Sequence, residues 1–281
     1  MSDRPQRRKP RLRTAGVLRT EWLTPRLIRV VLGGPELADL EVGEYTDHYV
    51  KLVFPRPGVE YPRPLDLEAV RAELPPDQWP RTRAYTVRAF DPAALELTID
   101  FVYHGDTGLG GPWAAAARRG DEISFLGPGG AYAPDPAADW HLLVGDTSAL
   151  PAIAAAVERL PHAVPARVLV EVADAEEELK LDASGDVEVV WVHRAGRPFG
   201  EALVEEVRAR PLPGGRGQAF VHGEAHFVRN LRRWLRVENQ MAPEQLSISG
   251  YWRCDVDDEG WRASKKEWNA RIDREEEQAL R

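Results

Sequence analysis

Residues 83–88 read Arg-Ala-Tyr-Thr-Val-Arg, and residues 100–105 read Asp-Phe-Val-Tyr-His-Gly after one short turn. Both stretches are predicted to be β-strands. Because side chains alternate along a strand, we expect Arg83, Tyr85 and Thr86 to project together from one face. Such a face offers a cation for a phosphate, an aromatic wall for a ring system and a hydroxyl for a ring nitrogen or carbonyl. We interpret it as a flavin cradle.

The first half of the chain is predicted to be β-structure. Short strands separated by turn signals, with few helices between them, favour an antiparallel barrel or sandwich. Helices are expected only near residues 67–72, inside a proline-rich loop, and at 113–119, where Gly120 resembles a C-cap. The predicted strands are 17–22, 27–32, 48–54, 83–90, 95–103 and 122–126, and the first two are expected to form a hairpin.

A glycine-rich loop follows the second of the two opening strands. Residues 106–112 read Asp-Thr-Gly-Leu-Gly-Gly-Pro and lead directly into the helix predicted from Trp113. Glycines allow backbone N–H groups to approach an anion, and a helix N-terminus adds a favourable dipole. In physical terms this loop is predicted to be a pyrophosphate site.

The second half changes character after residues 131–139, which are rich in Ala, Pro and Asp and are predicted to be a linker. Strands and helices then alternate, which is typical of a parallel sheet with crossover connections. We therefore expect a disordered basic tail at 1–14, a β-barrel at 15–132 and an α/β domain at 139–281. The predicted elements are strands at 141–144, 168–172, 187–192, 218–222 and 247–249, and helices reaching to 160 and at 201–208, 225–236 and 261–280. The arginines of 225–236 are expected to form a solvated face. Trp261 and Trp268, seven residues apart, are expected to pack on the α/β domain.

The composition narrows the possible functions. The 281 residues are 43% hydrophobic and carry a net charge of −8, which disfavours general nucleic-acid binding. A single cysteine, Cys254, excludes an internal disulfide, a four-thiolate zinc site and an iron–sulfur cluster. We expect no bound metal, so that any redox chemistry comes from an organic cofactor or the substrate. Without a long apolar run or a secretory signal, a cytoplasmic monomer is expected.

An ordered set of motifs resembles the siderophore-interacting proteins, FAD-containing ferric-siderophore reductases of the ferredoxin-reductase-like group. The resemblance covers roughly residues 15–255 and implies an FAD-binding barrel followed by an NAD(P)H-binding α/β domain. Its matching stretches are 83–88, 100–105, 113–114, 120–121, 127–128, 145–146, 149–152, 223–225 and 250–253.

The resemblance also implies roles for residues of the first half. Arg83 would hold a flavin phosphate or ribose, Tyr85 would pack along the isoalloxazine, and Thr86 would hydrogen-bond to it. The further residues implied to contact FAD are Ala84, Val87, Asp100, Phe101, Val102 and His104, with Gly110, Gly111 and Trp113 at the pyrophosphate.

In the second half, nucleotide binding is predicted at the strand-to-helix turn formed by Asp146, Thr147, Ser148 and Ala149. Ligands of open α/β sheets bind at this edge, although an ordinary capped helix explains the same residues. The resemblance places Tyr251 and Trp252 beside the flavin, where either is able to cover the ring until nicotinamide displaces it.

The cations Lys51 and Arg253 are candidates to receive an anionic ferric chelate, with an exposed strand residue as the alternative for Lys51. The donor, NADPH or NADH, stays open. The pair His193-Arg194 is suited to the 2′-phosphate of NADPH, and a solvated loop explains it as well.

Three positions depart from the family pattern. Gly111 stands where the family usually has Ser, Gly129 where it often has a basic residue, and Thr147-Ser148 where it usually has Glu-Thr. We expect an NAD(P)H-dependent flavoprotein that reduces ferric siderophores and releases Fe(II). Two alternatives remain: a flavin reductase that passes electrons to a protein acceptor, and a siderophore-binding flavoprotein with little reductase activity.

Overall fold

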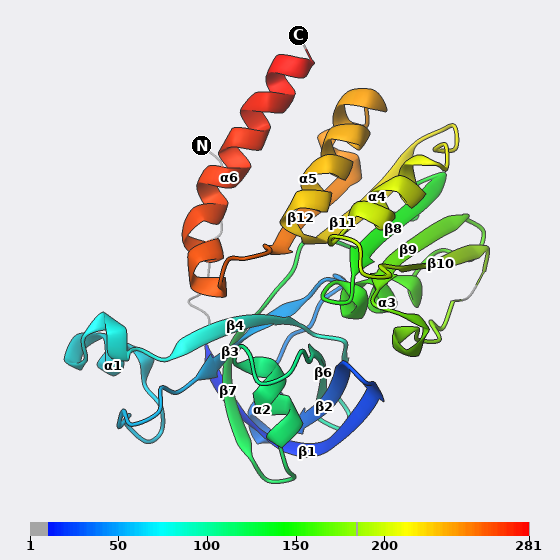
Figure 1. Ribbon diagram of the computed structural model, residues 1–281. Helices are drawn as coiled ribbons and strands as arrows, with labels where there is room; N and C mark the ends of the chain where they lie inside the picture. The colour runs from blue at the N-terminus through cyan, green and yellow to red at the C-terminus, as the bar shows by residue number, and fades with distance from the viewer. Residues whose placement is uncertain (1–10, 184, 281) are drawn as a thin grey trace, which may run out of the picture. The chain divides into compact units, whose positions relative to one another are not determined.

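The computed structural model describes residues 11–183 and 185–280, which form two compact units (Figure 1). Unit 1 comprises residues 11–21, 28–43 and 48–129, and unit 2 comprises 22–27, 44–47 and 130–280. Most of the predicted basic tail, residues 1–10, lies outside the described residues. Its end was misplaced, because the first strand already begins at Leu12.

Unit 1 is built on an antiparallel sheet of seven strands in the order β4-β3-β7-β1-β2-β6-β5. The first two strands form the predicted hairpin, and the short helix of the proline-rich loop is also confirmed. The strands are β1 (Leu12–Thr24), β2 (Leu27–Gly33), β3 (Tyr49–Phe54), β4 (Arg81–Thr86), β5 (Ala89–Asp91), β6 (Glu96–Val102) and β7 (Glu122–Gly129). The helices are α1 (Leu67–Glu73), α2 (Gly110–Ala116) and single 3-10 turns at Pro35–Leu37 and Pro76–Gln78.

The single strand predicted at 83–90 is wrong, because it is two strands at opposite ends of the sheet order. β4 pairs with β3, whereas β5 pairs with β6. Between them, the Val87 N–H donates to the His48 carbonyl at 2.7 Å and the Arg88 N–H donates to the Thr98 carbonyl at 2.9 Å. The chain thereby crosses from one edge of the sheet to the other and curls the sheet towards a barrel, a solution that leaves fewer open edges.

The interior of unit 1 is filled from several strands at once. Ala15 and Val17 alternate inward along β1, and Phe101 of β6 and Phe125 of β7 are fully buried. Burying a Phe side chain stabilises a fold by about 1.5–3 kcal/mol, so these rings are a large part of the barrel's stability. The helix predicted to begin at Trp113 begins three residues earlier, at Gly110.

Unit 2 is the predicted parallel sheet of five strands, and their order is β10-β9-β8-β11-β12. All carboxyl ends of its strands therefore lie at one edge. The strands are β8 (Trp140–Asp146), β9 (Ala166–Val172), β10 (Val187–His193), β11 (Gly217–Glu224) and β12 (Leu246–Trp252). The helices are α3 (Leu150–Val157), α4 (Glu201–Arg208), α5 (Ala225–Arg233) with a π turn at Trp234–Glu238, α6 (Asp258–Ala279) and 3-10 turns at Ala175–Glu177 and Pro243–Gln245.

Helices cover both faces of this sheet (Figure 1). On one face, Leu203 of α4 and Phe227 of α5 share a buried cluster with Leu142 of β8. On the other face, a side chain at Gly145 would meet Ile153 of α3 at 2.9 Å, so α3 packs directly on the strand backbone. Because both faces are covered, the central strands β8 and β9 carry buried apolar runs at 142–144 and 168–170, which is typical of parallel sheets.

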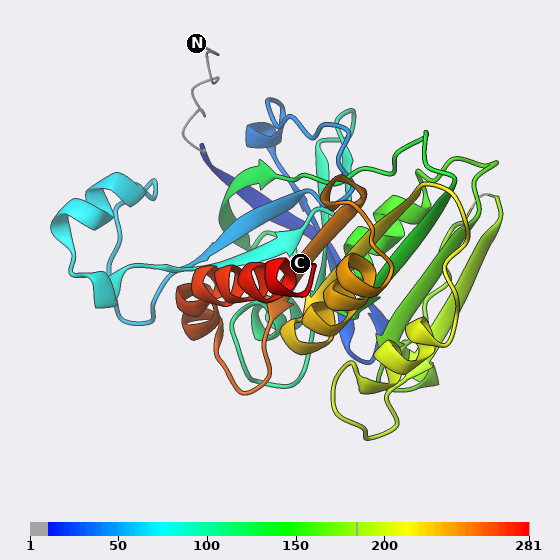
Figure 2. The same cartoon turned by 90° about the horizontal axis from the view of Figure 1, so that it is seen from above.

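Helix α6 runs alongside α5 (Figure 2). The arginines of α5 were predicted to be a solvated face, but two of them bind α6. Arg229 pairs with Glu275 at 2.6 Å, and Arg232 pairs with Asp273 at 2.7 Å and with Glu276 at 2.8 Å. The predicted packing of Trp261 and Trp268 on the α/β domain is confirmed, since both are buried in one cluster with Ala225 of α5, and their ring centroids are 5.2 Å apart.

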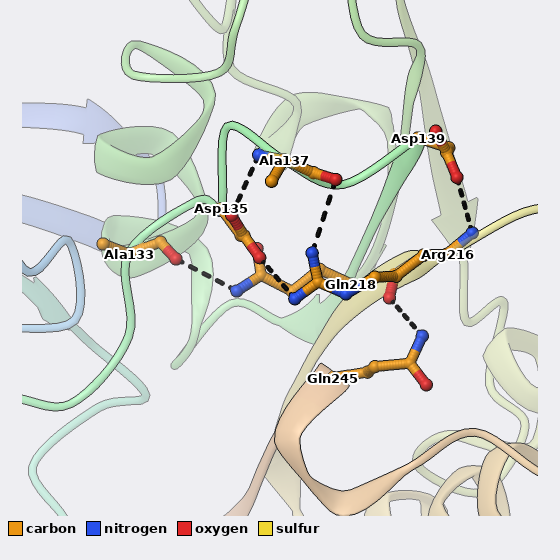
Figure 3. Close-up of polar contacts among 8 residues, drawn as sticks. Ala133, Asp135, Ala137, Asp139, Arg216, Gln218 and Gln245 are labelled. Carbon is orange, nitrogen blue, oxygen red and sulfur yellow. Dashed lines mark hydrogen bonds and ion pairs between the residues drawn. The ribbon is translucent and has the colours of Figure 1, made fainter.

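The predicted linker is tied to unit 2 by polar contacts (Figure 3). Arg216 donates to Asp135 at 2.7 Å, and its backbone N–H donates to Asp139 at 2.7 Å. Gln218 donates to the carbonyl of Ala133 at 3.1 Å and accepts from the backbone N–H of Asp135. The segment is therefore an ordered part of the α/β unit.

Among the described helices, we find none with both the length and the apolar character needed to cross a membrane.

Replacing Arg232 tests how α6 is held. The Arg232→Ala variant leaves the Glu276 carboxylate, whose side chain is 7% exposed, without its ion-pair partner. A buried charge that loses its partner is costly, and we expect the free energy of unfolding to fall by about 2–4 kcal/mol in urea titrations.

The matched control is Arg271→Ala. Its side chain is 54% exposed and pairs with Glu275 of the same helix at 3.9 Å, so its removal should cost at most about 0.5 kcal/mol. Equal losses for the two variants would show that the Arg232 pairs do not anchor α6.

Candidate functional site

The two halves of the predicted flavin cradle meet in unit 1. A side chain at Gly110 would lie 1.9 Å from the Tyr85 hydroxyl, so the ring of Tyr85 rests against the glycine-rich loop. The same ring packs on Phe101 with centroids 4.4 Å apart. The strand and the loop, about 25 residues apart in the chain, thus form one surface, and only glycine fits where they touch.

The expectation that three polar side chains share one face is wrong for Thr86. It directly follows Tyr85 in β4, and neighbouring residues of a strand point to opposite faces. Thr86 is buried, Arg83 is half-buried and Ala84 is exposed. Arg83 and Tyr85 therefore share a face, and Val87, which is also buried, belongs to the barrel core.

Of the site residues predicted on β6, Asp100 and Phe101 are buried and support the fold, and Val102 is partly accessible. Asp100 is buried and accepts two hydrogen bonds from Arg29 of β2, at 2.7 and 2.8 Å. Arg29 was not among the predicted site residues, because only the strand pairing brings it to Asp100. Phe101 is fully buried beneath Trp113, at a centroid distance of 5.5 Å.

The more accessible predicted residues lie at the end of β6 and beyond it. Val102 is half-buried and His104 is exposed, whereas Gly110 and Gly111 are buried. The surface that remains for a ligand is therefore made by Val102, His104 and the half-buried Trp113, over a floor of buried glycines.

Two departures from the family pattern have a steric reason. A side chain at Gly111 would lie 2.9 Å from the carbonyl oxygen of Val102, too close for a Cβ atom. At Gly129 a side chain would lie 2.8 Å from the ring of Tyr49, its cross-strand neighbour. Tyr49 thus fills the space that a larger residue at position 129 would need.

Asp146 is the most densely hydrogen-bonded group at the carboxyl edge of the sheet in unit 2. One carboxylate oxygen accepts from the backbone N–H and the hydroxyl of Ser148, at 2.9 and 2.5 Å. The other accepts from the Glu224 N–H and from the Trp252 indole, both at 2.8 Å. Burial raises the pKa of Asp146, and these donors oppose the rise.

The four residues of the predicted nucleotide turn therefore differ in exposure. The Asp146 carboxylate faces protein donors, and Ala149 is fully buried. Thr147 and Ser148 are half-buried, and the Ser148 hydroxyl already donates to Asp146. Within this turn, Thr147 offers the accessible hydroxyl.

The two aromatic residues at the end of β12 have different surroundings. Trp252, fixed by Asp146, meets Phe199 edge-on with centroids 4.9 Å apart. Tyr251 meets His222 edge-on at 5.0 Å, and burial raises the pKa of Tyr251. Burial also lowers the pKa of His222 to about 3, so its ring is neutral at physiological pH.

Glu171 is a buried carboxylate that was not among the predicted site residues. It ends the apolar run of β9 and accepts from the Gly200 N–H through both oxygens, at 2.6 and 3.2 Å. Burial raises its pKa to about 7, against the Gly200 hydrogen bond and the charge of Arg194. The charged residue within an otherwise apolar strand could have indicated this site. Its hydrogen-bond partner, Gly200, lies 29 residues further along the chain and is not apparent locally.

The two predicted substrate cations belong to different units. Lys51 is exposed on β3 of unit 1, opposite Ala84 of β4. Arg253 follows β12 of unit 2 and is half-buried.

Comparison with known proteins identifies both units. Residues 16–132 match the family described as the siderophore-interacting FAD-binding domain, and residues 138–255 match the family described as siderophore-interacting protein. Together these matches cover most of the chain.

Several relatives match over nearly their whole length. An uncharacterized protein of Mycobacterium tuberculosis is 47% identical over 89% of this chain and 93% of its own. Ferric vibriobactin reductase ViuB of Vibrio cholerae is 32% identical over 93% and 96%. The NADPH-dependent ferric-chelate reductase of Escherichia coli is 30% identical over 87% and 94%.

Among solved structures, the siderophore-interacting protein SipS from Aeromonas hydrophila superposes with a TM-score of 0.80. It is 30% identical in sequence, and the match covers 93% of this chain and 99% of that protein. The fold predicted from the sequence, an antiparallel barrel followed by a parallel α/β domain, is confirmed.

Glu171 should make the stability of the fold depend on pH. Its folded-state pKa of about 7 lies above the ordinary value of 4.5, so its contribution is complete below pH 4.5 and is lost as the pH rises through 7. Glu171→Gln removes the buried charge and keeps an acceptor for Gly200. We expect the free energy of unfolding of this variant to be about 1–3 kcal/mol higher than that of the wild type at pH 8 and equal to it near pH 5.

Thermal unfolding at both pH values measures the difference. The control is Glu188→Gln, in which the replaced carboxylate is 52% exposed and a pH-dependent gain is not expected. A Glu171→Gln variant that is less stable than the wild type at pH 8 would contradict this assignment.

Proposed function

This chain belongs to the siderophore-interacting protein family, and we propose that it is an FAD-dependent NAD(P)H:ferric-siderophore oxidoreductase. The observation that carries the proposal is the close contact of Tyr85 with Gly110, which joins the two predicted parts of a flavin site. The names of two relatives, a ferric vibriobactin reductase and an NADPH-dependent ferric-chelate reductase, support the reaction.

In this proposal, residues 15–132 bind FAD. Arg83 holds a phosphate or ribose, Tyr85 packs along the ring system, and the loop N–H groups at Gly110 and Gly111 receive the pyrophosphate. The Thr86 side chain points to the opposite face of β4, so it supports the flavin site by fixing the backbone of that strand. The remaining contacts come from Ala84, Val102, His104 and Trp113, and the buried Val87, Asp100 and Phe101 support them from beneath. Bound FAD supplies the conversion of a hydride into single electrons for Fe(III).

Residues 139–281 bind the electron donor at the carboxyl edge of their sheet, the usual ligand edge of such sheets. Thr147 contacts the dinucleotide directly, while Asp146, Ser148 and Ala149 shape the turn beneath it. Tyr251 and Trp252, at the end of β12, are further proposed cofactor contacts. Arg194, at the end of the outermost strand β10, receives the 2′-phosphate, which makes NADPH the preferred donor.

The substrate is an anionic ferric chelate attracted by Lys51 and Arg253. Reduction to Fe(II) weakens its hold on the chelator and releases the metal. We place the reaction in the cytoplasm and expect the protein to act as a monomer.

The experiment is anaerobic stopped-flow mixing of the purified flavoprotein with NADPH or NADH, followed by a ferric siderophore and a chromogenic Fe(II) chelator. We expect NADPH to bleach the oxidised-flavin band and the siderophore to restore it as Fe(II) appears. Bleaching by neither nucleotide would indicate a siderophore-binding flavoprotein. Bleaching with electron transfer only to a protein acceptor would indicate a flavin reductase.

Gly110→Ala should lower the FAD content of the purified protein. Its new methyl group forces Tyr85 out of position, since the hydroxyl lies 1.9 Å from the Cβ site. We expect roughly a tenfold loss in FAD affinity, on the scale of one displaced contact. Fluorescence titration of the apoprotein with FAD measures it.

The matched control is Gly16→Ala, in the same unit. There the nearest atom to a new Cβ is 3.8 Å away, an ordinary contact, so FAD affinity should be unchanged. Full FAD affinity in Gly110→Ala would remove the support that the contact gives to the proposed flavin site.

A further inference from the structure

Three side chains form a row across the carboxyl edge of the sheet in unit 2. Trp252, at the end of β12, meets Phe199 edge-on at 4.9 Å. The guanidinium of Arg194, which follows β10, lies 4.0 Å from the centroid of the Phe199 ring. Because β10 and β12 are the two outermost strands, this row spans the edge where parallel sheets bind their ligands.

The first end of the row is fixed by Asp146. Its buried carboxylate accepts from the Trp252 indole N–H at 2.8 Å, and three further donors hold the same carboxylate. Moving Trp252 would leave a buried acceptor short of a donor, which is costly. The Trp252 side chain therefore has a fixed position against which Phe199 packs.

The middle of the row is fixed through its backbone. Gly200, next to Phe199, donates to the buried Glu171, and a side chain at Gly200 would lie 2.2 Å from Phe227. Arg197 ties the same loop to Glu205 with two hydrogen bonds, at 2.7 and 2.8 Å. The backbone of the loop that carries Phe199 is thus fixed by these contacts, although the Phe199 side chain is 41% exposed.

Arg194 is the charged member of the row. In the part of the chain that the structure describes, its guanidinium forms no ion pair; it stacks on the Phe199 ring, and its charge opposes the rise in the pKa of Glu171. A long arginine side chain loses rotamer freedom when it binds a phosphate, and stacking on a fixed ring restricts that freedom beforehand.

We propose that Phe199 is a positioning residue for donor selectivity: braced by Trp252, it holds Arg194 ready for the 2′-phosphate of NADPH. This inference rests on the proposed function and extends it to a residue that touches Arg194 rather than the chemistry. Since NADH lacks the 2′-phosphate, the loss of Phe199 should weaken NADPH binding and leave NADH binding nearly unchanged.

The test measures dissociation constants of NADP⁺ and NAD⁺ for the FAD-loaded protein by calorimetry. Phe199→Leu should weaken NADP⁺ binding roughly two- to fivefold, the range of a cation–π contact at an exposed site, and leave NAD⁺ binding unchanged. Phe199→Tyr keeps the ring and should keep the wild-type ratio. In an Arg194→Ala background, Phe199→Leu should have no additional effect.

Arg208→Ala is the control for loss of an exposed positive charge. Arg208, at the end of α4, is 43% exposed and pairs with Glu238 of the π turn. This variant should not change the ratio. Equal weakening of both dinucleotides by Phe199→Leu overturns the proposal, as does additivity with Arg194→Ala. Tighter binding of both would show that Phe199 covers the site. A wild type that binds neither dinucleotide, or prefers NAD⁺, overturns the proposed function itself.

Discussion

A buried carboxylate that binds four donors organises the α/β unit. Asp146 ends β8 and accepts from the turn that follows it, from the end of β11 at Glu224 and from Trp252 at the end of β12. Its environment supplies only donors, the set that an ionised carboxylate requires. Gly223 allows this approach, because a Cβ there would lie 2.6 Å from the carboxylate. Three neighbouring strands thus end in one defined arrangement.

The same physical device recurs along this edge. Glu171 accepts from Gly200 at the start of α4, and Glu224 accepts from the N–H groups of His226 and Cys254. Each carboxylate satisfies backbone donors that a helix start or loop would otherwise leave unpaired. Desolvating these acids is costly, but each one fixes a loop at the edge where ligands of such sheets bind. The edge is rigid before any ligand arrives.

Local sequence patterns predicted most elements, because strand and helix periodicities depend on near neighbours. The five strands of the parallel sheet were all found, and α4 was found with the bounds 201–208. The failures have specific causes. The run 83–90 looks like one strand locally, yet its two parts pair with different partners. The arginines of α5 looked solvent-facing, since nothing local indicates that α6 lies beside them.

The sequence alone determined the family resemblance, the order of a barrel and an α/β domain, and the flavin-binding interpretation of residues 83–88, because each depends on residue types in a fixed order. Only the tertiary structure decided which polar groups face a ligand and which hold the frame. Asp100 pairs with Arg29, and Asp146 binds Trp252, across 71 and 106 positions of the chain. Such pairings depend on strand order and register, which bring distant residues together without leaving a local signal.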